Sequence, residues 1–302
     1  MPVSNSTTAP VCALPQTLLI RISGEDRVKF LQGQLTNDIT RLKPAALMTA
    51  GWCTPQGRLL MTPRLFAEDD AVGMLIDAVN AERLIKRLRM YVLRSKVAIE
   101  VDDSRRAVGI LGPVPEALEG VPVFALSEGR EEVRALLALP QGRAIAIVPA
   151  DMPVSADDRA FRAASAAAGE VWISGAASEA FVPQAANLEL TGGVSFTKGC
   201  YTGQEVVSRV EHIGRVSRRA ALAVGEAPCD PAPMTEVLDD RGNPAGVVIC
   251  AGAAGSKAAA LVQLSAETAL QAGKAPLSLS IAGVRFETRP LPYGYDRSAQ
   301  AA

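Results

Sequence analysis

The chain has 302 residues, of which 48% are hydrophobic and 21% are charged, and its formal net charge at pH 7 is -1. This length favours two or three globular domains, and the near-zero charge excludes a bulk electrostatic attraction to nucleic acids or membranes. A single histidine, His212, excludes HExxH zinc sites and multi-histidine metal centres, so no metal ligands are predicted.

The N-terminal residues and the cysteines indicate a cellular compartment. Residues 1–15 have no basic segment followed by an apolar run, so we expect no signal peptide. No apolar segment approaches the roughly 20 residues that span a bilayer. The five cysteines show no CxxC spacing, which is typical of proteins in a reducing compartment. We therefore expect a cytoplasmic protein without membrane contact.

The first hundred residues show strand and helix patterns in alternation. The predicted elements are strands at 17–23, 47–53, 58–66 and 71–77 and helices at 25–35 and 81–94. The helix at 25–35 has an apolar face of Val28, Leu31 and Leu35. Thr54-Pro55-Gln56-Gly57 is typical of a hairpin turn. Together these elements indicate an α/β or α+β layer.

The helix at 81–94 and the residues just after it are rich in basic side chains. These are Arg83, Lys86, Arg87, Arg89, Arg94 and Lys96. Such a run is most often a solvated helix face. The alternative is a surface for an anionic partner, either a polyglutamate tail or the backbone of RNA weakly bound at residues 83–96. Aromatic residues make up only 4% of the chain, which weakens a dedicated RNA-binding function because single-strand readers stack bases on aromatic rings.

Residues 97–169 show a related pattern of strands and helices, which indicates a second α/β unit. The predicted elements are strands at 97–101, 106–111 and 143–149, helices at 131–139 and 156–169, and a loop at 112–122. Phe161 lies on the last of these helices, where core packing is the more common role of an aromatic side chain. Beyond residue 214, an arginine cluster (Arg215, Arg218 and Arg219) leads into a series of short strands. These strands, at 220–224, 246–251, 259–264 and 277–288, predict a small β-barrel.

Residues 181–214 differ from the rest of the chain in composition, and Cys200 lies at their centre. The apolar spacing predicts a helix over 204–211, preceded by a capping box in which Thr202 is the N-cap and Glu205 its partner. Arg209 is placed to pair with Glu205 across one turn. A helix N-terminus and the neighbouring Lys198 would both favour the reactive thiolate. The alternative is an inert, buried cysteine in a loop before a helix.

Three segments carry a resemblance to a known family. Lys198-Gly199-Cys200-Tyr201-Thr202-Gly203-Gln204-Glu205, preceded by FVPQAANLEL (181–190), resembles the signature of the YgfZ family, which is related to the T-protein, the aminomethyltransferase of the glycine cleavage system. Residues 30–38 and 54–58 match further family patterns. The resemblance implies an α+β fold with a T-protein-like arrangement of three domains around a central opening. The expected domains are two α/β units at 14–100 and 101–214 and a C-terminal β-barrel at 215–295.

The resemblance also implies a function. Members of the family bind folate and support iron–sulfur cluster assembly or repair, and through it tRNA-modifying enzymes, so tetrahydrofolate or a derivative is the expected cofactor. Iron–sulfur assembly or client proteins are the expected partners, and a lone cysteine would contact a cluster only together with a partner.

The residues implied in this function follow from the same resemblance. Cys200 and Lys198 are the expected catalytic residues. The expected folate contacts are Asn37, Asp38, Phe161, Asn187, Tyr201, Gln204, Glu205 and Arg209. From the residues alone, Asn37 and Asp38 fit equally well as turn residues after a helix.

The alternative function is that of a folate-dependent aminomethyltransferase. T-proteins place an aspartate shortly after an asparagine at the end of a strand. Here Asn80 is followed by Ala81, Glu82, Arg83 and Leu84, with no aspartate. The chain is therefore not expected to be a typical aminomethyltransferase.

Overall fold

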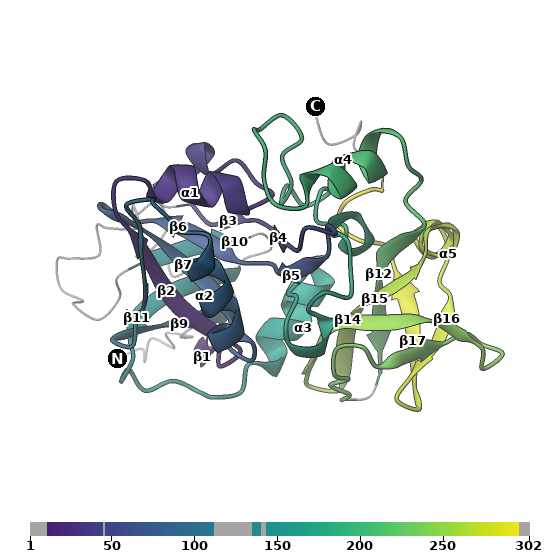
Figure 1. Ribbon diagram of the computed structural model, residues 1–302. Coiled ribbons are helices and arrows are strands. Elements are labelled where there is room, and N and C mark those ends of the chain that lie inside the picture. The colour runs from purple at the N-terminus through teal and green to yellow at the C-terminus, as the bar shows by residue number, and fades with distance from the viewer. Residues whose placement is uncertain (1–10, 45, 112–134, 140–142, 227, 296–302) are drawn as a thin grey trace, which may run out of the picture.

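The computed structural model describes residues 11–44, 46–111, 135–139, 143–226 and 228–295. Two antiparallel sheets lie together at one end of the molecule, a closed barrel lies at the other, and helix α3 (Arg159–Ala167) packs between them (Figure 1). This is the expected α+β architecture with a C-terminal barrel. No helix in the described part of the chain is long and apolar enough to cross a membrane.

The first sheet has the strand order β3-β6-β7-β2-β8 and is antiparallel throughout. Its strands are β2 (Thr17–Ser23), β3 (Met48–Thr49), β6 (Arg64–Ala67), β7 (Ala71–Asp77) and β8 (Ala98–Val101). Strands β2 and β7 match the predicted bounds. The predicted strands at 47–53 and 58–66 are each broken in two, because β4 (Trp52–Cys53) and β5 (Leu59–Met61) leave the sheet to form a separate hairpin around the predicted turn at 54–57.

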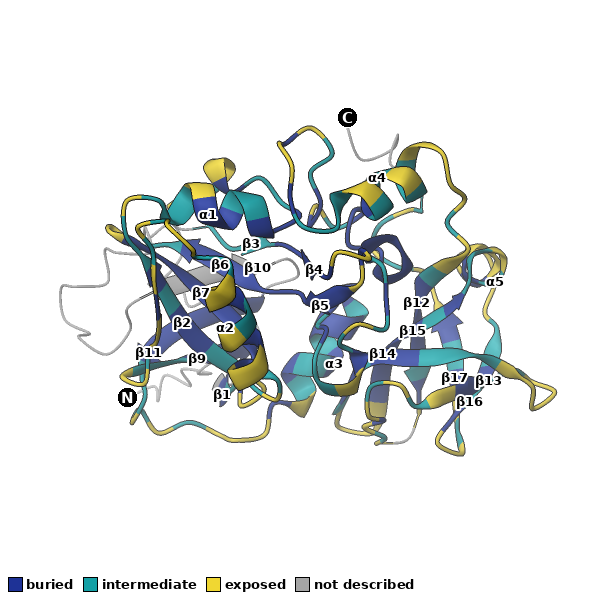
Figure 2. Ribbon diagram, viewed as in Figure 1, coloured by how far each residue is buried: buried dark blue, intermediate teal, exposed yellow. Residues whose placement is uncertain are grey.

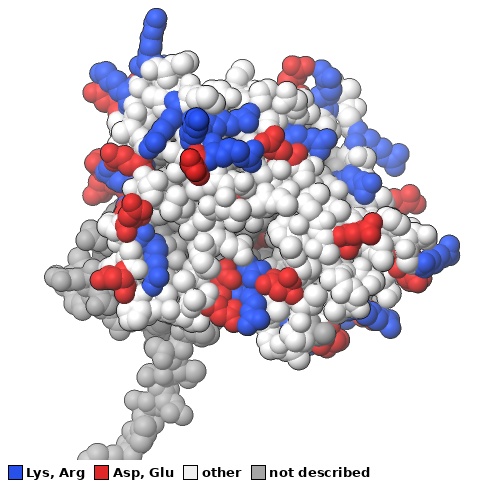
Figure 3. Space-filling model, turned by 60° about the horizontal axis from the view of Figure 1, so that its bottom comes forward, with Lys and Arg blue, Asp and Glu red and all other residues white. Residues whose placement is uncertain are grey.

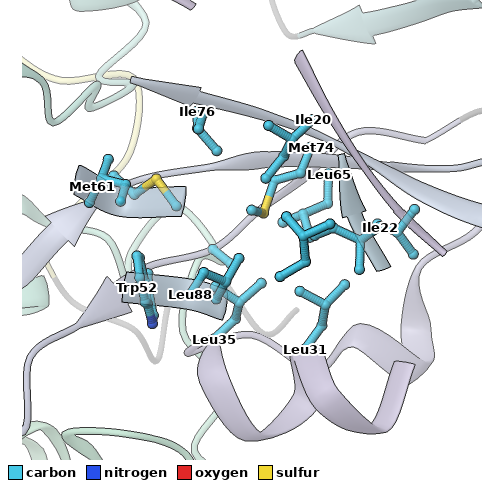
Figure 4. Close-up of a cluster of buried hydrophobic side chains, with 14 of the residues drawn as sticks. Ile20, Ile22, Leu31, Leu35, Trp52, Met61, Leu65, Met74, Ile76 and Leu88 are labelled. Carbon is cyan, nitrogen blue, oxygen red and sulfur yellow. The ribbon is translucent and has the colours of Figure 1, made fainter. Parts of the chain in front are cut away.

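Both faces of this sheet are buried, which explains why β7 is buried along its whole length. On one face, Ile20 and Ile22 pack against α1 (Arg27–Gln34) and α2 (Ala81–Met90) (Figure 4). On the other face, Leu19 packs on the second sheet. The alternation follows from the two-residue period of a strand. Helix α2 ends at Met90, four residues before the predicted end.

The second sheet has the order β1-β9-β11-β10. Its strands are β1 (Val11–Ala13), β9 (Arg105–Leu111), β10 (Ala135–Leu139) and β11 (Arg143–Pro149). The helix predicted at 131–139 is wrong where the structure describes it, because residues 135–139 form β10 and pair with β11 along its length. Residues 131–134 and the loop predicted at 112–122 lie outside the described residues.

The barrel closes in the order β12-β15-β14-β13-β16-β17, with β17 returning to β12. Its strands are β12 (Arg218–Gly225), β13 (Glu236–Leu238), β14 (Pro244–Ala254), β15 (Lys257–Ser265), β16 (Ser278–Ile281) and β17 (Val284–Arg289). Apolar side chains fill its interior, among them Val237 and Phe286. Helix α5 (Ala266–Ala272), which was not predicted, packs against β12 and β15.

The remaining elements form a layer that connects the two sheets and the barrel. They are the 3-10 turns η1 (Ile39–Arg41), η3 (Gly175–Ala177) and η4 (Pro183–Ala186) and helix α4 (Gln204–His212). Residues of this layer are buried where they face the sheets and the barrel and exposed on their outer side (Figure 2). The predicted domain boundaries at 100 and 214 stay a prediction. Strand β1 precedes the first predicted unit and pairs with β9 of the second sheet.

Candidate functional site

The three segments that carry the family resemblance meet in space. The backbone N–H of Thr202 donates to the carbonyl of Gly33 at 3.2 Å. Gly203 lies against the hairpin turn, where a Cβ on it would come within 2.4 Å of the Thr54 carbonyl oxygen. Gly57 lies against Val206 of α4 in the same way. The loop 198–203 therefore rests on α1 and on the 54–57 turn, at the top of the molecule in Figure 1.

Lys198 anchors this loop to the end of α1. Its side chain is 8% exposed, and its ammonium Nζ donates to the carbonyls of Gln32 and Leu35, each at 2.6 Å. A cation at the C-terminal end of a helix compensates the partial negative charge of the last carbonyls. Burial lowers the pKa of Lys198 to about 8, while the charge of Asp38 acts in the opposite direction.

Tyr201 completes the anchor. It is buried, and the Lys198 ammonium lies 5.0 Å from the centre of its ring. Burial raises the pKa of its hydroxyl, and that hydroxyl has no hydrogen-bond partner among the described residues. Tyr201 therefore holds the loop from below, and its side chain is not displayed toward solvent.

Cys200 lies between these two buried residues and is itself exposed. Lys198 and Tyr201 are buried, whereas Gly199 and Cys200 between them are exposed. Within the described residues, the hydrogen bonds of the Lys198 ammonium go to backbone carbonyls, and none joins it to the Cys200 thiol. The geometry thus gives Lys198 a positioning role beneath the thiol.

The start of α4 differs from the predicted capping box. Gly203, with φ of 84°, occupies the N-cap position, and no side chain caps the helix. Glycine is favoured here because the backbone is left-handed and because a Cβ on residue 203 would collide with the 54–57 turn. The predicted pairing of Glu205 with Arg209 is present at 2.7 Å on the exposed face of α4. Gln204 is the first residue of the helix and is half-buried.

Asn187 lies in the interior and joins η4 to the barrel. It is fully buried with φ of 55°, and its side-chain amide exchanges two hydrogen bonds with the backbone of Ala220, at 2.9 and 3.2 Å. Nearby, the buried carboxylate of Glu189 pairs with Arg219. The Asn187 side chain therefore ties η4 to β12 of the barrel.

Asn37 and Asp38 lie at the end of α1, beside the anchored loop. Asn37 donates to the carbonyls of Thr49 and Gly192, at 2.7 and 2.8 Å, and so ties residues 191–194 to the first sheet. Asp38 accepts hydrogen bonds from Thr40 and Gln32, and the Thr40 hydroxyl holds the pKa of Asp38 below its usual range. Asp38 therefore serves the local turn, whereas Asn37 joins distant segments of the chain.

A separate cavity of about 300 Å³ lies where the two sheets, α3 and the barrel meet. It is lined by Leu14, Gln16, Thr17, Thr62, residues 75–77, Asp158, Phe161, Arg162, Ser165, residues 172–174, residues 230–233, Cys250 and Ala251. Because the first sheet, α3 and the barrel all contribute to its wall, we equate it with the expected central opening. Among the predicted folate contacts, Phe161 lies in this wall, and the loop 198–205 does not contribute to it.

Asp77 is the cavity residue that the sequence interpretation missed. It ends β7 and is 5% exposed, and its carboxylate accepts hydrogen bonds from the side chain of Asn80 at 2.7 Å and from the backbone N–H of Gly175 at 3.0 Å. Asp77 comes three residues before Asn80, whereas the spacing typical of T-proteins places an aspartate after the asparagine. A carboxylate that closes the otherwise apolar strand 71–77 was the signal that could have identified it.

Two aromatic residues form the apolar part of the cavity wall. Phe161 is 1% exposed, and its ring lies where a side chain on Gly109 would be, so it is a core residue that presents little surface to the cavity. The Trp172 ring lies 3.8 Å from the guanidinium of Arg64. The buried indole N–H of Trp172 has no partner among the described residues. The N–H is thus enclosed by protein atoms, and the rest of Trp172 lines the cavity.

Charged side chains surround one side of the cavity. Arg162 pairs with Asp158 on its own helix, at 3.0 Å, and with Asp230 of the barrel, at 2.6 Å. Burial alone would lower the pKa of Arg162, but the two carboxylates raise it overall. Acidic and basic groups alternate at the lower centre of the face in Figure 3. The described residues hold no group of three or more His, Cys, Asp or Glu side chains placed to bind a metal ion.

The basic residues of 83–96 are partly used within the protein. Arg83 pairs with Glu179 at 2.6 Å, and Lys96 pairs with Glu25 at 2.7 Å. Arg89 donates to the carbonyl of Ile99. Lys86 and Arg94 are exposed, and Figure 3 shows Lys and Arg side chains gathered over α2. An anionic partner at this surface stays a prediction.

Comparisons with known proteins identify the fold and the family of the chain. The family models that were compared give no match. The chain is 32% identical to the tRNA-modifying protein YgfZ of Hamiltonella defensa, in an alignment that covers 78% of each chain. Among solved structures, the glycine cleavage system aminomethyltransferase T from Bartonella henselae superposes with a TM-score of 0.63 over 96% of this chain and 87% of its own, at 16% identity. The structural likeness confirms the expected T-protein-like fold. The sequence identity and its coverage show that the chain belongs to the YgfZ family.

Proposed function

We propose that the protein is a folate-binding accessory protein that supports tRNA modification by assisting iron–sulfur cluster assembly or repair. In this proposal tetrahydrofolate, or a derivative of it, binds in the central cavity, and Cys200 supplies a reactive thiol on the separate loop 198–203. The five cysteines, which are all free, suit a cytoplasmic setting for such work.

The observation that carries the folate proposal is the 300 Å³ cavity, whose lining brings the carboxylates of Asp77 and Asp158 together with apolar side chains and Trp172. Small-molecule sites are usually concave, mostly apolar pockets with a few polar groups that converge on the ligand. A pterin ring has N–H groups that would suit the carboxylates of Asp77 and Asp158, and faces that would suit the apolar wall. The residues present therefore fit the group.

The design of the loop supports the thiol proposal. Lys198 and Tyr201 are buried on either side of Cys200, and Thr202 is bonded to Gly33, so the backbone that carries the thiol is held at several points. A thiol displayed on a braced loop can meet a partner protein at little cost in conformational entropy. A cluster held this way would need further ligands from that partner.

The folate proposal is tested by calorimetric titration of tetrahydrofolate into Trp172→Phe. Loss of part of the indole ring from the cavity wall should weaken binding by roughly threefold to tenfold. Trp52→Phe is the matched control, because Trp52 is also a buried tryptophan but lies in the core beside α1 and does not line the cavity. Equal affinities in the two variants would contradict a folate at this wall.

The thiol proposal is tested by complementation of a bacterial strain that lacks its own YgfZ. Cys200→Ala should fail to restore the iron–sulfur-dependent tRNA modification, and the half-buried Cys229→Ala should restore it. Full restoration by Cys200→Ala would remove the thiol from the proposal.

One observation favours a second candidate, the folate-dependent aminomethyltransferase. Asp77, beside Asn80 at the edge of the cavity, supplies a carboxylate of the kind that such an enzyme needs. This candidate requires turnover with an aminomethylated lipoyl carrier protein, and no turnover is expected of the accessory protein.

A further inference from the structure

A second, larger hollow lies between the end of α4 and the outer surface of the barrel. It has a volume of about 1180 Å³ and does not share a wall with the central cavity. It is lined by Arg58, residues 180–182, Ala185, Val210, residues 215–218, Met234, Glu236, Asp239, residues 244–247, Gln263, Ser265 and Thr268. We call this hollow the α4–barrel groove. Its lining comes from several parts of the fold. Arg58 follows the hairpin turn at 54–57, Val210 lies on α4, and most of the residues after 217 belong to the barrel.

The floor of the α4–barrel groove is apolar. Val182, Val210 and Val216 are partly exposed there, and Met234 is 37% exposed. Ile213, which follows α4 close to this lining, is 85% exposed and is among the most exposed large apolar side chains of the described residues. An apolar floor of this kind, with methionine and arginine around it, has the composition of a protein–protein contact surface.

The rim of the groove carries cations without acidic partners. Arg215 and Arg218 are exposed, and no ion pair joins either of them to another described residue. Arg58 is exposed and donates to the carbonyl of Ala180 at 2.9 Å, which leaves its charge uncompensated. Three uncompensated arginines on one rim attract an anionic partner.

The acidic residues of the lining cancel only part of this charge. The carboxylate of Asp239 accepts hydrogen bonds from the backbone N–H groups of Arg241 and Asn243, at 2.9 and 2.8 Å. These bonds hold the pKa of Asp239 below its usual range and keep it ionised. Glu236 is a second, exposed carboxylate, so the three arginines of the lining exceed its two carboxylates by one charge.

Size and surface chemistry select the class of occupant. The groove exceeds the roughly 300–1,000 Å³ of small-molecule sites, so it suits a segment of chain. Single-stranded nucleic acid would need exposed aromatic rings for its bases. Phe181 is the aromatic side chain of the lining, and it is 1% exposed. We propose that the α4–barrel groove docks a segment of a partner protein in which Asp or Glu side chains alternate with apolar ones.

The groove lies close to the loop that carries Cys200. Helix α4 begins directly after the Cys200 loop and ends at the groove, and its nine residues span about 13 Å. A partner held in the groove would lie within one short helix of the exposed thiol. The inference rests on the groove's own residues and does not require that folate binds in the central cavity.

The test uses the full chain and a phage-displayed library of random peptides as the probe. Peptides are selected on the wild type, with Arg215→Glu/Arg218→Glu as the counter-selection target, and the enriched sequences are then synthesised and titrated. We expect enrichment of acidic residues interspersed with apolar ones. Binding should weaken by about tenfold or more in Arg215→Glu/Arg218→Glu.

The control variant is Lys86→Glu/Arg94→Glu, which makes the same change in net charge at the exposed basic residues near α2. It should leave the affinity unchanged. The milder Arg215→Gln/Arg218→Gln variant should rank between the wild type and the charge reversal, which keeps the test decisive if charge reversal disturbs the fold. Tetrahydrofolate titration of the same variants reports separately on the central cavity.

Several results would overturn the inference. These are a selection that yields no acidic enrichment, an equal loss of affinity in Lys86→Glu/Arg94→Glu, and tighter binding of an oligouridylate RNA that displaces the selected peptides. The last result would assign the groove to nucleic acid.

Discussion

Lys198 connects the chemistry of single residues to the shape of the Cys200 loop. Its position in the sequence, two residues before the cysteine, indicates activation of the thiol, but its ammonium lies on the carbonyls of Gln32 and Leu35. A buried ammonium that donates to two carbonyls positions the backbone on both sides of it. The residue therefore acts on Cys200 through the loop.

The pKa of Lys198 makes this anchor sensitive to pH. Burial lowers the pKa from 10.5 to about 8, so between these values the unfolded chain holds more protons than the folded one, and stability rises with pH. We expect the free energy of unfolding of the wild type, relative to Lys198→Met, to increase by roughly 1–3 kcal/mol between pH 8 and 10.5. Urea unfolding at several pH values measures this. A difference that stays flat across this window would contradict the anchor.

Cys200 should also stand out among the five cysteines in its reactivity. Burial raises the pKa of Cys12 to about 11 and that of Cys53 to about 12, and it also raises the pKa values of Cys229 and Cys250. Iodoacetamide at neutral pH should therefore modify one thiol in the native protein at least about tenfold faster than the others. Peptide mapping should locate the modification at Cys200, and Cys200→Ser should abolish the fast phase. A fast phase that persists in this variant would contradict the assignment.

At the scale of elements, two glycines bring the motif segments together. Gly203 has φ of 84°, and a Cβ on it would lie 2.4 Å from the Thr54 carbonyl oxygen, so Gly203→Ala should lower the free energy of unfolding by about 2 kcal/mol or more. Gly199→Ala is the matched control, because a Cβ on Gly199 would have no atom within 4 Å, and it should stay within about 0.5 kcal/mol of the wild type. Urea unfolding compares the two, and equal effects would refute the contact.

Local pattern was sufficient for the segments whose apolar periodicity agrees with their place in the fold. Strands β2, β7 and β11 and helix α4 lie where their apolar periodicity predicted them. Local pattern failed where contacts with distant segments determine the secondary structure. Residues 135–139 favour helix by composition, yet they pair with β11, and tertiary pairing overrides propensity. The N-cap at Gly203 depends on the 54–57 turn, which lies far away in the sequence.

At the scale of the whole molecule, the two proposed sites lie in different places. The thiol loop rests on α1 and on the 54–57 turn, whereas the cavity is formed by β7, α3 and the barrel. The resemblance in the motif predicted the loop and the three-domain fold. Of the cavity wall, Phe161 was among the predicted contacts, but Asp77, Trp172 and Arg162 were not, because they come from three separate segments and only the fold brings them together. We therefore expect folate binding and thiol chemistry to be separable by mutation.

The most direct test of this account is calorimetric titration of tetrahydrofolate into the wild type, Cys200→Ala and Asp77→Asn. We expect one site in the wild type, the same affinity in Cys200→Ala, and binding weaker by about tenfold in Asp77→Asn, because the amide replaces one acceptor oxygen with a donor. Absence of binding to the wild type, or unchanged affinity in Asp77→Asn together with lost affinity in Cys200→Ala, would contradict a folate site in the central cavity.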